Sequence, residues 1–290
     1  MSTIDTASLG QPIHGPRALT DDWGRFWHLT YNIARNEFKL RFFGSALGYF
    51  WQLMRPFLLF GVLYVFFTLV AHVNSSTGPG SHFYGAQLLG SIVLFTFFGE
   101  ATGGAVRSVV DRENLVRKIQ FPRLVIPLSV VLLASFNLGL NLIVVLIFAL
   151  IEGVTPMLSW LELPLIVAFL AVFATGIAML LSALFVTLRD IQPIWDVLQQ
   201  ILFYASPVII SVDTVREKLS HTLVHVYMLN PLAVAFQQFR HAMVTHGTPS
   251  AGAVLGGWSA LAATMVIVVA VFALGFWIFN RSARLIAENL

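Results

Sequence analysis

Two carboxylates, Glu100 and Asp196, stand inside long apolar stretches of the sequence. A charge at the centre of a bilayer costs on the order of 3 kcal/mol on insertion scales, so each needs a partner. One interpretation is that they line a water-filled path or move protons. The other is that each lies near one end of its stretch, paired with an arginine or hydrogen-bonded between helices. Because no chain of Asp, Glu and His forms a relay, the second interpretation is favoured.

Histidines are the other residues that could do chemistry. His221 and His225 are four apart on a possible helix, and His241 and His246 follow. The sequence HTLVH lacks the glutamate of a zinc protease, and no further ligand has a suitable spacing. The absence of cysteine excludes disulfides, thiolate metal sites and a cysteine nucleophile. No GxSxG is present either. We expect surface histidines, no metal site and no catalytic residue.

The lysines exclude one way of using ATP. Lys39, Lys118 and Lys218 follow Phe, Arg and Glu, so the chain has no GxxxxGK[ST] phosphate loop. We therefore expect no cofactor in this chain and no ATP hydrolysis by that route. Active transport would take its energy from an ion gradient or from a partner, and the missing relay favours the partner.

Composition places these residues in a membrane. Hydrophobic residues make up 57% of the 290 residues and charged residues 11%, against about 25% charged in soluble domains. The net charge of +3 could suggest nucleic acid. However, the basic residues cluster beside apolar runs, which indicates membrane topology rather than a phosphate-binding face. We expect membrane lipids around the chain and no nucleic acid.

A charged segment, residues 107–123, separates two apolar runs and holds five of the seventeen basic residues. Short loops rich in Lys and Arg stay on the cytoplasmic side. Its interior predicts a short two-sided helix, because Leu115, Val116 and Ile119 share one face. The surrounding residues are Arg112, Glu113, Arg117 and Lys118. Such a helix could bind another protein, or the segment could be an anchor that touches only lipid head groups.

The apolar runs predict an all-α membrane protein with six transmembrane helices. These are residues 56–73, 83–106, 124–151, 163–188, 191–212 and 257–279. The fifth is the least apolar, so it should face protein or water. Residues 1–21 form a flexible cytoplasmic tail, residues 22–48 an amphipathic interfacial helix, and residues 49–290 the transmembrane domain. Two short helices at the outer surface lie within residues 213–250. The charge distribution, with fourteen Lys and Arg inside and three outside, places both termini in the cytoplasm.

Aromatic residues gather in two places, around Tyr49, Phe50 and Trp51 and around Trp195 and Tyr204. Aromatic rings stack on sugar faces, so these rings could form a path for glycans. The alternative is that they form interfacial belts and helix-packing contacts.

Three groups of motifs carry a family resemblance. They are FPR at 121–123 followed by Pro127, LRDI at 188–191 with SPVI at 206–209, and NPL at 230–232 followed by Phe239 and Arg240. From residue 23 to the end, the chain resembles the permease subunit of type-two ABC exporters of O-antigen, capsule, teichoic acid and related lipid-linked polysaccharides. The resemblance implies a homodimer in the bacterial cytoplasmic membrane. Two separate ABC ATPase subunits would bind ATP and Mg.

The resemblance also implies roles for residues. Residues 112–120 would be the coupling helix that seats in the ATPase, and the helices within 213–245 would be outer gate helices. The head of a lipid diphosphate-linked glycan would be attracted to Arg35, Lys39, Arg41 and Arg55. O-antigen, teichoic acid and cell-wall galactan all fit as cargo.

Three other functions stay open at this stage. One is an ABC exporter of the same fold that moves a drug or a lipid. A second is an integral membrane glycosyl or acyl transferase, which would need a cluster of catalytic residues that the sequence does not display. The third is a passive channel, for which no charged ring or filter-like loop is present.

Overall fold

The computed structural model describes residues 23–42, 48–70, 83–113, 121–209, 212, 215–216, 220–244 and 248–282. Every regular element in this part of the chain is helical. Five segments are long and apolar enough to cross a bilayer: Phe50–Leu69, Tyr84–Val106, Val125–Glu152, Leu158–Thr187 and Leu261–Ser282. The prediction of an all-α membrane protein is confirmed, and the chain is a multi-pass membrane protein.

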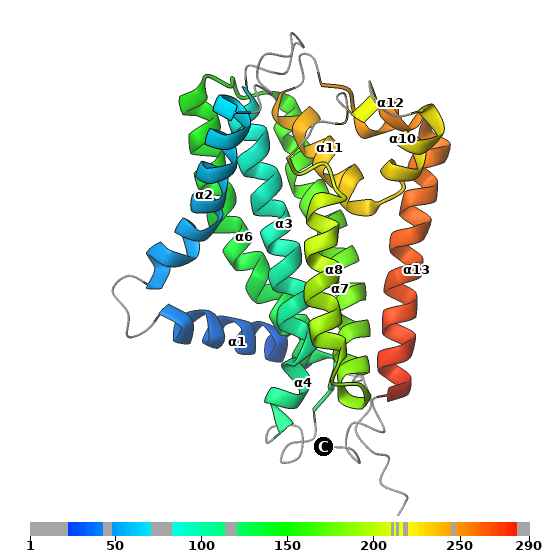
Figure 1. Ribbon diagram of the computed structural model, residues 1–290. Coiled ribbons are helices and arrows are strands. Elements are labelled where there is room, and N and C mark those ends of the chain that lie inside the picture. Colours follow the sequence, from blue (N-terminus) through cyan, green and yellow to red (C-terminus); the bar gives the residue numbers. More distant parts are fainter. Residues whose placement is uncertain are drawn as a thin grey trace, which may run out of the picture.

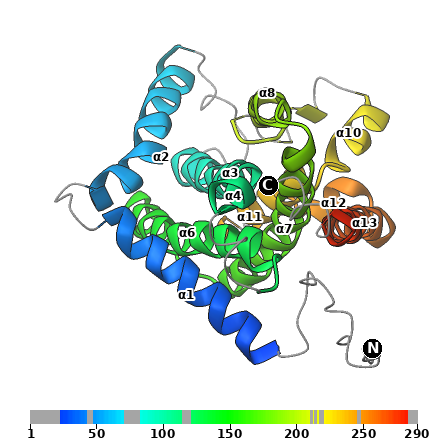
Figure 2. The same ribbon diagram turned by 90° about the horizontal axis from the view of Figure 1, so that it is seen from below.

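Helix α3 (Tyr84–Val106) lies at the centre of the bundle, beside α6 (Val125–Glu152) and α7 (Leu163–Thr187) (Figures 1 and 2). Of the spanning window of α3, 67% is buried within the chain. A helix that is apolar all round belongs in such an interior. We name the two ends of the bundle after the short helices there, the α4 end (Ser108–Asp111) and the α12 end (Ala251–Leu255).

Helix α13 (Trp258–Ser282) packs along α7 at a crossing made by two glycines. A Cβ atom on Gly275 would stand 2.1 Å from the carbonyl oxygen of Gly176. A Cβ atom on Gly176 would stand 2.7 Å from the Cα of Phe272. Small residues let membrane helices approach closely where lipid provides no hydrophobic drive for association. The α7–α13 contact therefore depends on these two positions lacking side chains.

Helix α1 (Trp23–Phe42) lies crosswise beneath α6 at the α4 end (Figures 1 and 2). Phe26, Thr30 and Ala34, spaced four apart, are buried against the bundle, while Trp23 and Trp27 are exposed. One face of α1 therefore holds it to the bundle, and the other is aromatic and cationic. Its position in the head-group layer, and the division of the chain into tail, interfacial helix and transmembrane domain, stay predictions; residues 1–22 and 43–47 lie outside the described ranges.

Helix α2 (Gly48–Val65) begins eight residues before the predicted start of the first span and continues as a π-helix, η2 (Phe66–Val70). Pro56 lies inside it rather than at its first turn. A proline inside a helix removes one backbone hydrogen bond and usually causes a kink, and α2 is bent in its lower half (Figure 1). The aromatic residues that were expected to precede the span are part of the helix.

Helix α8 (Ile191–Tyr204) is shorter than the expected fifth span, which was to reach residue 212. Its 14 residues rise about 21 Å at about 1.5 Å each, less than the hydrocarbon thickness of about 30 Å. It ends because Pro207 follows, and the residue before a proline disfavours helical backbone. The count of six transmembrane helices therefore stays a prediction.

Helices α10 (His221–Met228), α11 (Pro231–Met243) and α12 close the other end of the bundle (Figure 1). They pack with the 3-10 helix η5 (Leu158–Glu162) and the first turns of α7 and α13. Asn230 caps α11, because its side-chain oxygen accepts a hydrogen bond from the backbone N–H of Leu232 at 3.0 Å. The role of these helices as a gate stays a prediction.

Candidate functional site

A polar pocket of about 240 Å³ lies among α1, α2, α3 and α6. Its polar lining consists of Arg41, Gln52, Arg55 and Glu100. Two of the predicted substrate-binding arginines and one of the two intramembrane carboxylates thus share one cavity. The sequence offered an arginine as a partner of Glu100 but did not indicate which one. In the interior of a membrane protein such a cluster of charged residues is a candidate functional site.

Hydrogen bonds hold the Glu100 carboxylate in this pocket. Gln52 Nε2 donates to Oε1 at 2.6 Å, and Asn137 Nδ2 donates to Oε2 at 2.8 Å. These are the bundle contacts that the structural interpretation of Glu100 requires. Gln52 and Asn137 were not among the predicted site residues, although amides inside apolar helices are a usable signal, since each needs a hydrogen-bond partner there.

The basic residues near the pocket divide into two groups. Arg41 and Arg55 line it and are exposed, so their guanidinium groups are open to a ligand. Arg35 and Lys39 are exposed on α1 but are absent from the pocket lining. Arginine forms paired, planar hydrogen bonds to phosphate oxygens, which suits Arg41 and Arg55 for an anionic head group.

The aromatic residues predicted to contact a glycan differ in their exposure. Phe50 and Trp51 are exposed on α2, with ring centroids 6.4 Å apart. The side chain of Tyr49 lies outside the described part of the chain. Trp195 is only 8% exposed, and its Nε1 donates to Thr102 Oγ1 at 3.2 Å, so in this chain it packs α8 against α3. Tyr204 is 69% exposed.

Helix α8 has one face attached to α3 and one face free. Gln199 Nε2 donates to the carbonyl of Gly99 at 3.2 Å and to Thr102 Oγ1 at 3.0 Å. The opposite side exposes Ile194, Val197 and Ile201, and Asp196 is exposed as well. The helix was expected to face protein or water. Within the single chain, it faces protein only on its α3 side.

At the α4 end the structure describes only the start of the predicted coupling helix. Leu115, Val116, Arg117, Lys118 and Ile119 lie outside the described residues, while Arg112 and Glu113 are within them. The guanidinium group of Arg112 forms an ion pair with Glu37 of α1. It also donates, at 3.4 Å each, to the carbonyl of Ile126 and to Ser129 Oγ on α6. Arg112 thus joins the charged segment to both α1 and α6.

Arg123, the arginine of the FPR motif, is buried just before α6. Its burial lowers the pKa of its guanidinium group below the usual value, because desolvation disfavours the charged form. Arg123 is the last residue of the charged segment, and its burial ties the end of this segment to the bundle, since a buried cation is held by the groups packed around it.

At the other end, SPVI, NPL and Arg240 meet, whereas LRDI lies apart from them, at the start of α8. Asn230 Nδ2 of NPL donates to Ser206 Oγ of SPVI at 3.0 Å, and Arg240 Nη2 donates to the carbonyl of Val208 at 2.9 Å. Tyr84 at the start of α3 donates its hydroxyl hydrogen to the carbonyl of Ile209 at 3.1 Å. The turn after α8 is therefore fixed by α11 and α3. We call these residues the motif hub.

Fold and pocket together define a class, that of helical multi-pass membrane proteins with charged residues among their spanning helices. Within this class, the sequence profile of the family described as ABC-2 type transporter matches residues 28–244. The chain belongs to this family, and it is therefore a membrane component of a transport system. The resemblance seen in the motifs is confirmed.

Curated relatives extend this assignment. The chain is 28% identical over 241 residues to the O-antigen export system permease protein RfbA of Myxococcus xanthus, which covers 83% of this chain and 88% of that protein. It is also 28% identical over 137 residues to the protein of the same name from Klebsiella pneumoniae, covering 47% of this chain and 51% of the relative.

Proposed function

We propose that this chain is the transmembrane subunit of an ATP-driven exporter that moves a lipid-linked polysaccharide across the bacterial cytoplasmic membrane. The family and the names of the relatives support export of a polysaccharide of the O-antigen, teichoic acid or cell-wall galactan kind. The main structural support is the polar pocket, where the guanidinium groups of Arg41 and Arg55 can bind an anionic head group.

The charge distribution supports an orientation with the α4 end in the cytoplasm. Among the described residues, basic side chains gather at that end, in α1, the first turns of α2, the segment around α4, and the ends of α7 and α13. Between α8 and α12 the described basic residues are Arg216 and Arg240, apart from histidines. Because Lys and Arg are retained on the cytoplasmic side, the polar pocket opens toward the leaflet where a lipid-linked glycan is assembled.

In this orientation the pocket receives the diphosphate of the lipid carrier. The Glu100 oxygens already accept hydrogen bonds from the amides of Gln52 and Asn137, so the arginines are not needed to satisfy them. Arg41 and Arg55 bind phosphate oxygens, and Phe50 and Trp51 stack on the first sugars. The polymer then follows the exposed face of α2.

Helices α2 and α8 supply the seam of a homodimer. Only 11% of the spanning window of α2 is buried in the single chain, against 67% for α3. The exposed side chains of this window include Val62 of α2 and Phe66 and Leu69 of η2, and α8 exposes Ile194 and Val197. A second copy covers these faces, which flank α3 (Figure 2), and the glycan passes between the two copies.

Energy comes from two ABC ATPase subunits docked on residues 112–120. Closure of the ATPases on ATP pushes this segment, and Arg112 passes the motion to α1 and α6 through its contacts. Substituting Leu115→Asp or Arg117→Asp should abolish export and the coupling of ATP hydrolysis to transport, while membrane insertion is unchanged. Full transport by either variant would contradict this lever.

The cargo proposal is tested in a cell depleted of this chain. Lipid-linked polymer should accumulate on the cytoplasmic side, and the native chain should restore export. An Arg41→Gln and Arg55→Gln double variant should lower export about a hundredfold or more where binding of the cargo limits it, since two charge-assisted phosphate contacts of about 1.5–3 kcal/mol each are lost. Arg189→Gln, an exposed arginine of the same end outside the pocket lining, is the matched control. Depletion without accumulation of any lipid-linked polymer would refute the cargo class.

A further inference from the structure

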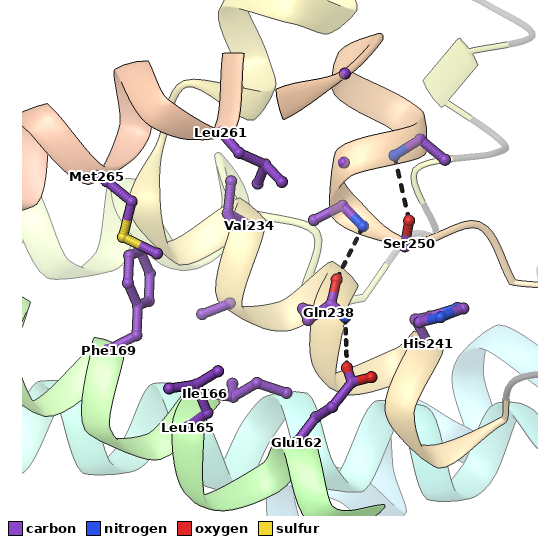
Figure 3. A pocket seen from close by; sticks show the side chains of 15 residues that line it. Glu162, Leu165, Ile166, Phe169, Val234, Gln238, His241, Ser250, Leu261 and Met265 are labelled. Atoms are coloured by element: carbon purple, nitrogen blue, oxygen red, sulfur yellow. Dashed lines mark hydrogen bonds between the residues drawn. The ribbon is translucent and has the colours of Figure 1, made fainter. Parts of the chain in front are cut away.

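A larger cavity, of about 730 Å³, lies among α7, α11, α12 and α13 toward the α12 end (Figure 3). Its volume is within the range of about 300–1,000 Å³ that small-molecule sites occupy. It lies on the side of the bundle away from α2, so it is separate from the cargo path proposed above (Figure 2). Nothing in the proposed function uses it.

The cavity is amphipathic. Phe169, Ile166, Leu261 and Met265 line one side, and Gln238, His241 and Ser250 line the other (Figure 3). Binding sites with a mostly apolar lining and a few convergent polar groups take ligands that are themselves two-sided. An amphiphile, with a hydrocarbon tail and a polar head, matches this division.

The polar side is held in place by hydrogen bonds. Gln238 Nε2 donates to Glu162 Oε2 at 2.6 Å, and Gln238 Oε1 accepts from the backbone N–H of Ala251 at 3.1 Å (Figure 3). His241 Nδ1 lies 2.8 Å from the carbonyl oxygen of Thr248. Glu162 is the carboxylate of the lining, and its position is fixed by Gln238. A fixed carboxylate at one end of an apolar cavity favours a cationic head group.

The cavity opens toward lipid. Leu165 and Met265, which line it, are 72% and 52% exposed and belong to the spanning segments Leu158–Thr187 and Leu261–Ser282. Exposed apolar side chains at the start of spanning helices meet the acyl chains of the adjacent leaflet. A lipid tail can therefore enter sideways between α7 and α13 without crossing water.

We propose that this cavity binds one membrane lipid whose head group carries an ammonium, with its acyl tail against Phe169, Leu261 and Met265 and the ammonium beside Glu162. The bound tail fills the space between α11, α12 and the spanning helices α7 and α13. The lipid is a structural ligand of the α12 end and is not the exported cargo.

The test is photolabelling of the full-length chain in lipid vesicles. The probe is phosphatidylethanolamine with a diazirine on its acyl chain, and the labelled peptides are mapped by mass spectrometry. We expect label concentrated on the peptides that contain Phe169, Leu261 and Met265. Ala253→Trp, at an exposed position of the lining, should lower this labelling about tenfold by filling the cavity. Leu165→Trp is a second filling variant, and Val266→Trp, exposed on α13 outside the lining, is the matched control.

The head group is tested by a second probe with an anionic head, phosphatidylglycerol with the same tail. The native chain should label about tenfold more with the ethanolamine probe. Glu162→Gln, which keeps an acceptor for Gln238, should remove this preference while tail labelling persists. Label spread evenly over the exposed faces of α2 and α13 and unchanged by both filling variants would overturn the site. Equal labelling of the native chain by both probes would overturn the assignment of the head group.

Discussion

Arg112, in the charged segment, forms an ion pair with Glu37, in the second half of the crosswise helix α1. The two residues are 75 positions apart in sequence, and both side chains are partly exposed, 17% and 31%. The pair connects the segment expected to meet the ATPase with a helix that lies along the base of the bundle. The proposed lever therefore has two attachments in the bundle, α1 and α6.

Breaking this pair should impair transport more than stability. A partly exposed ion pair contributes only about 0–1 kcal/mol to folding, so Glu37→Arg should shift the free energy of unfolding by about that amount. Arg112→Glu should cost somewhat more, because it also removes the hydrogen bonds to Ile126 and Ser129. Each should nevertheless lower export severalfold, because α1 and the charged segment are then pushed apart. The double reversal, Glu37→Arg with Arg112→Glu, should recover part of the export. An export assay on the four chains measures this, and additive losses without recovery would exclude coupling through the pair.

Replacing Glu100 by Leu should destabilise the bundle. The amides of Gln52 and Asn137 would lose their acceptor in the interior, and an unsatisfied buried polar group costs about 1–3 kcal/mol. Thermal unfolding in detergent should show a clearly lowered midpoint. Asp196→Leu, on the exposed side of α8, is the comparison and should leave the midpoint nearly unchanged. Similar midpoints for both variants would contradict the structural role of Glu100.

Gly275→Leu should separate α13 from α7. Even the Cβ atom would overlap the backbone of Gly176, so the helices cannot keep their distance, and overpacking of this kind costs about 1–3 kcal/mol or more. We expect a lower unfolding midpoint and faster proteolysis near α13. Gly61→Ala and Gly139→Ala, where an added Cβ atom meets nothing within 4 Å, are matched controls in other spanning helices. A native midpoint for Gly275→Leu would show that the crossing is looser than described.

Asn230→Ala should loosen the motif hub. The change removes the cap of α11 and the hydrogen bond to Ser206, and loss of a helix cap costs about 0.5–2 kcal/mol. Hydrogen exchange should accelerate in the first turn of α11 and in the turn after α8. Ser206→Ala leaves the cap of α11 intact and removes only the hydrogen bond to the turn, so α11 should stay protected while the turn after α8 exchanges faster. Equal protection in native chain and Asn230→Ala would argue against the hub.

The sequence alone was sufficient for the class of the fold, because apolar runs of spanning length have few alternatives in a bilayer. The four spans other than α2 and α8 follow from such runs, and the gathering of basic residues at the α4 end follows from the charge pattern. The start of α2 and the end of α8 did not, because α2 begins before Pro56 and continues through it, whereas α8 ends before Pro207, within the expected span. The sequence motifs indicated a family, but they did not indicate that NPL, SPVI and the FR pair contact one another.

The tertiary structure decided which polar residues act together. Arg41, Arg55 and Glu100 share a pocket because α1 folds back along the base of the bundle and α2 rises beside α3, an arrangement that no local pattern encodes. The same holds for Glu37 and Arg112, and for Glu162 and Gln238. Burial periodicity reports whether a residue faces the interior. It cannot report which distant residue it meets there, because that depends on the packing of whole helices against one another.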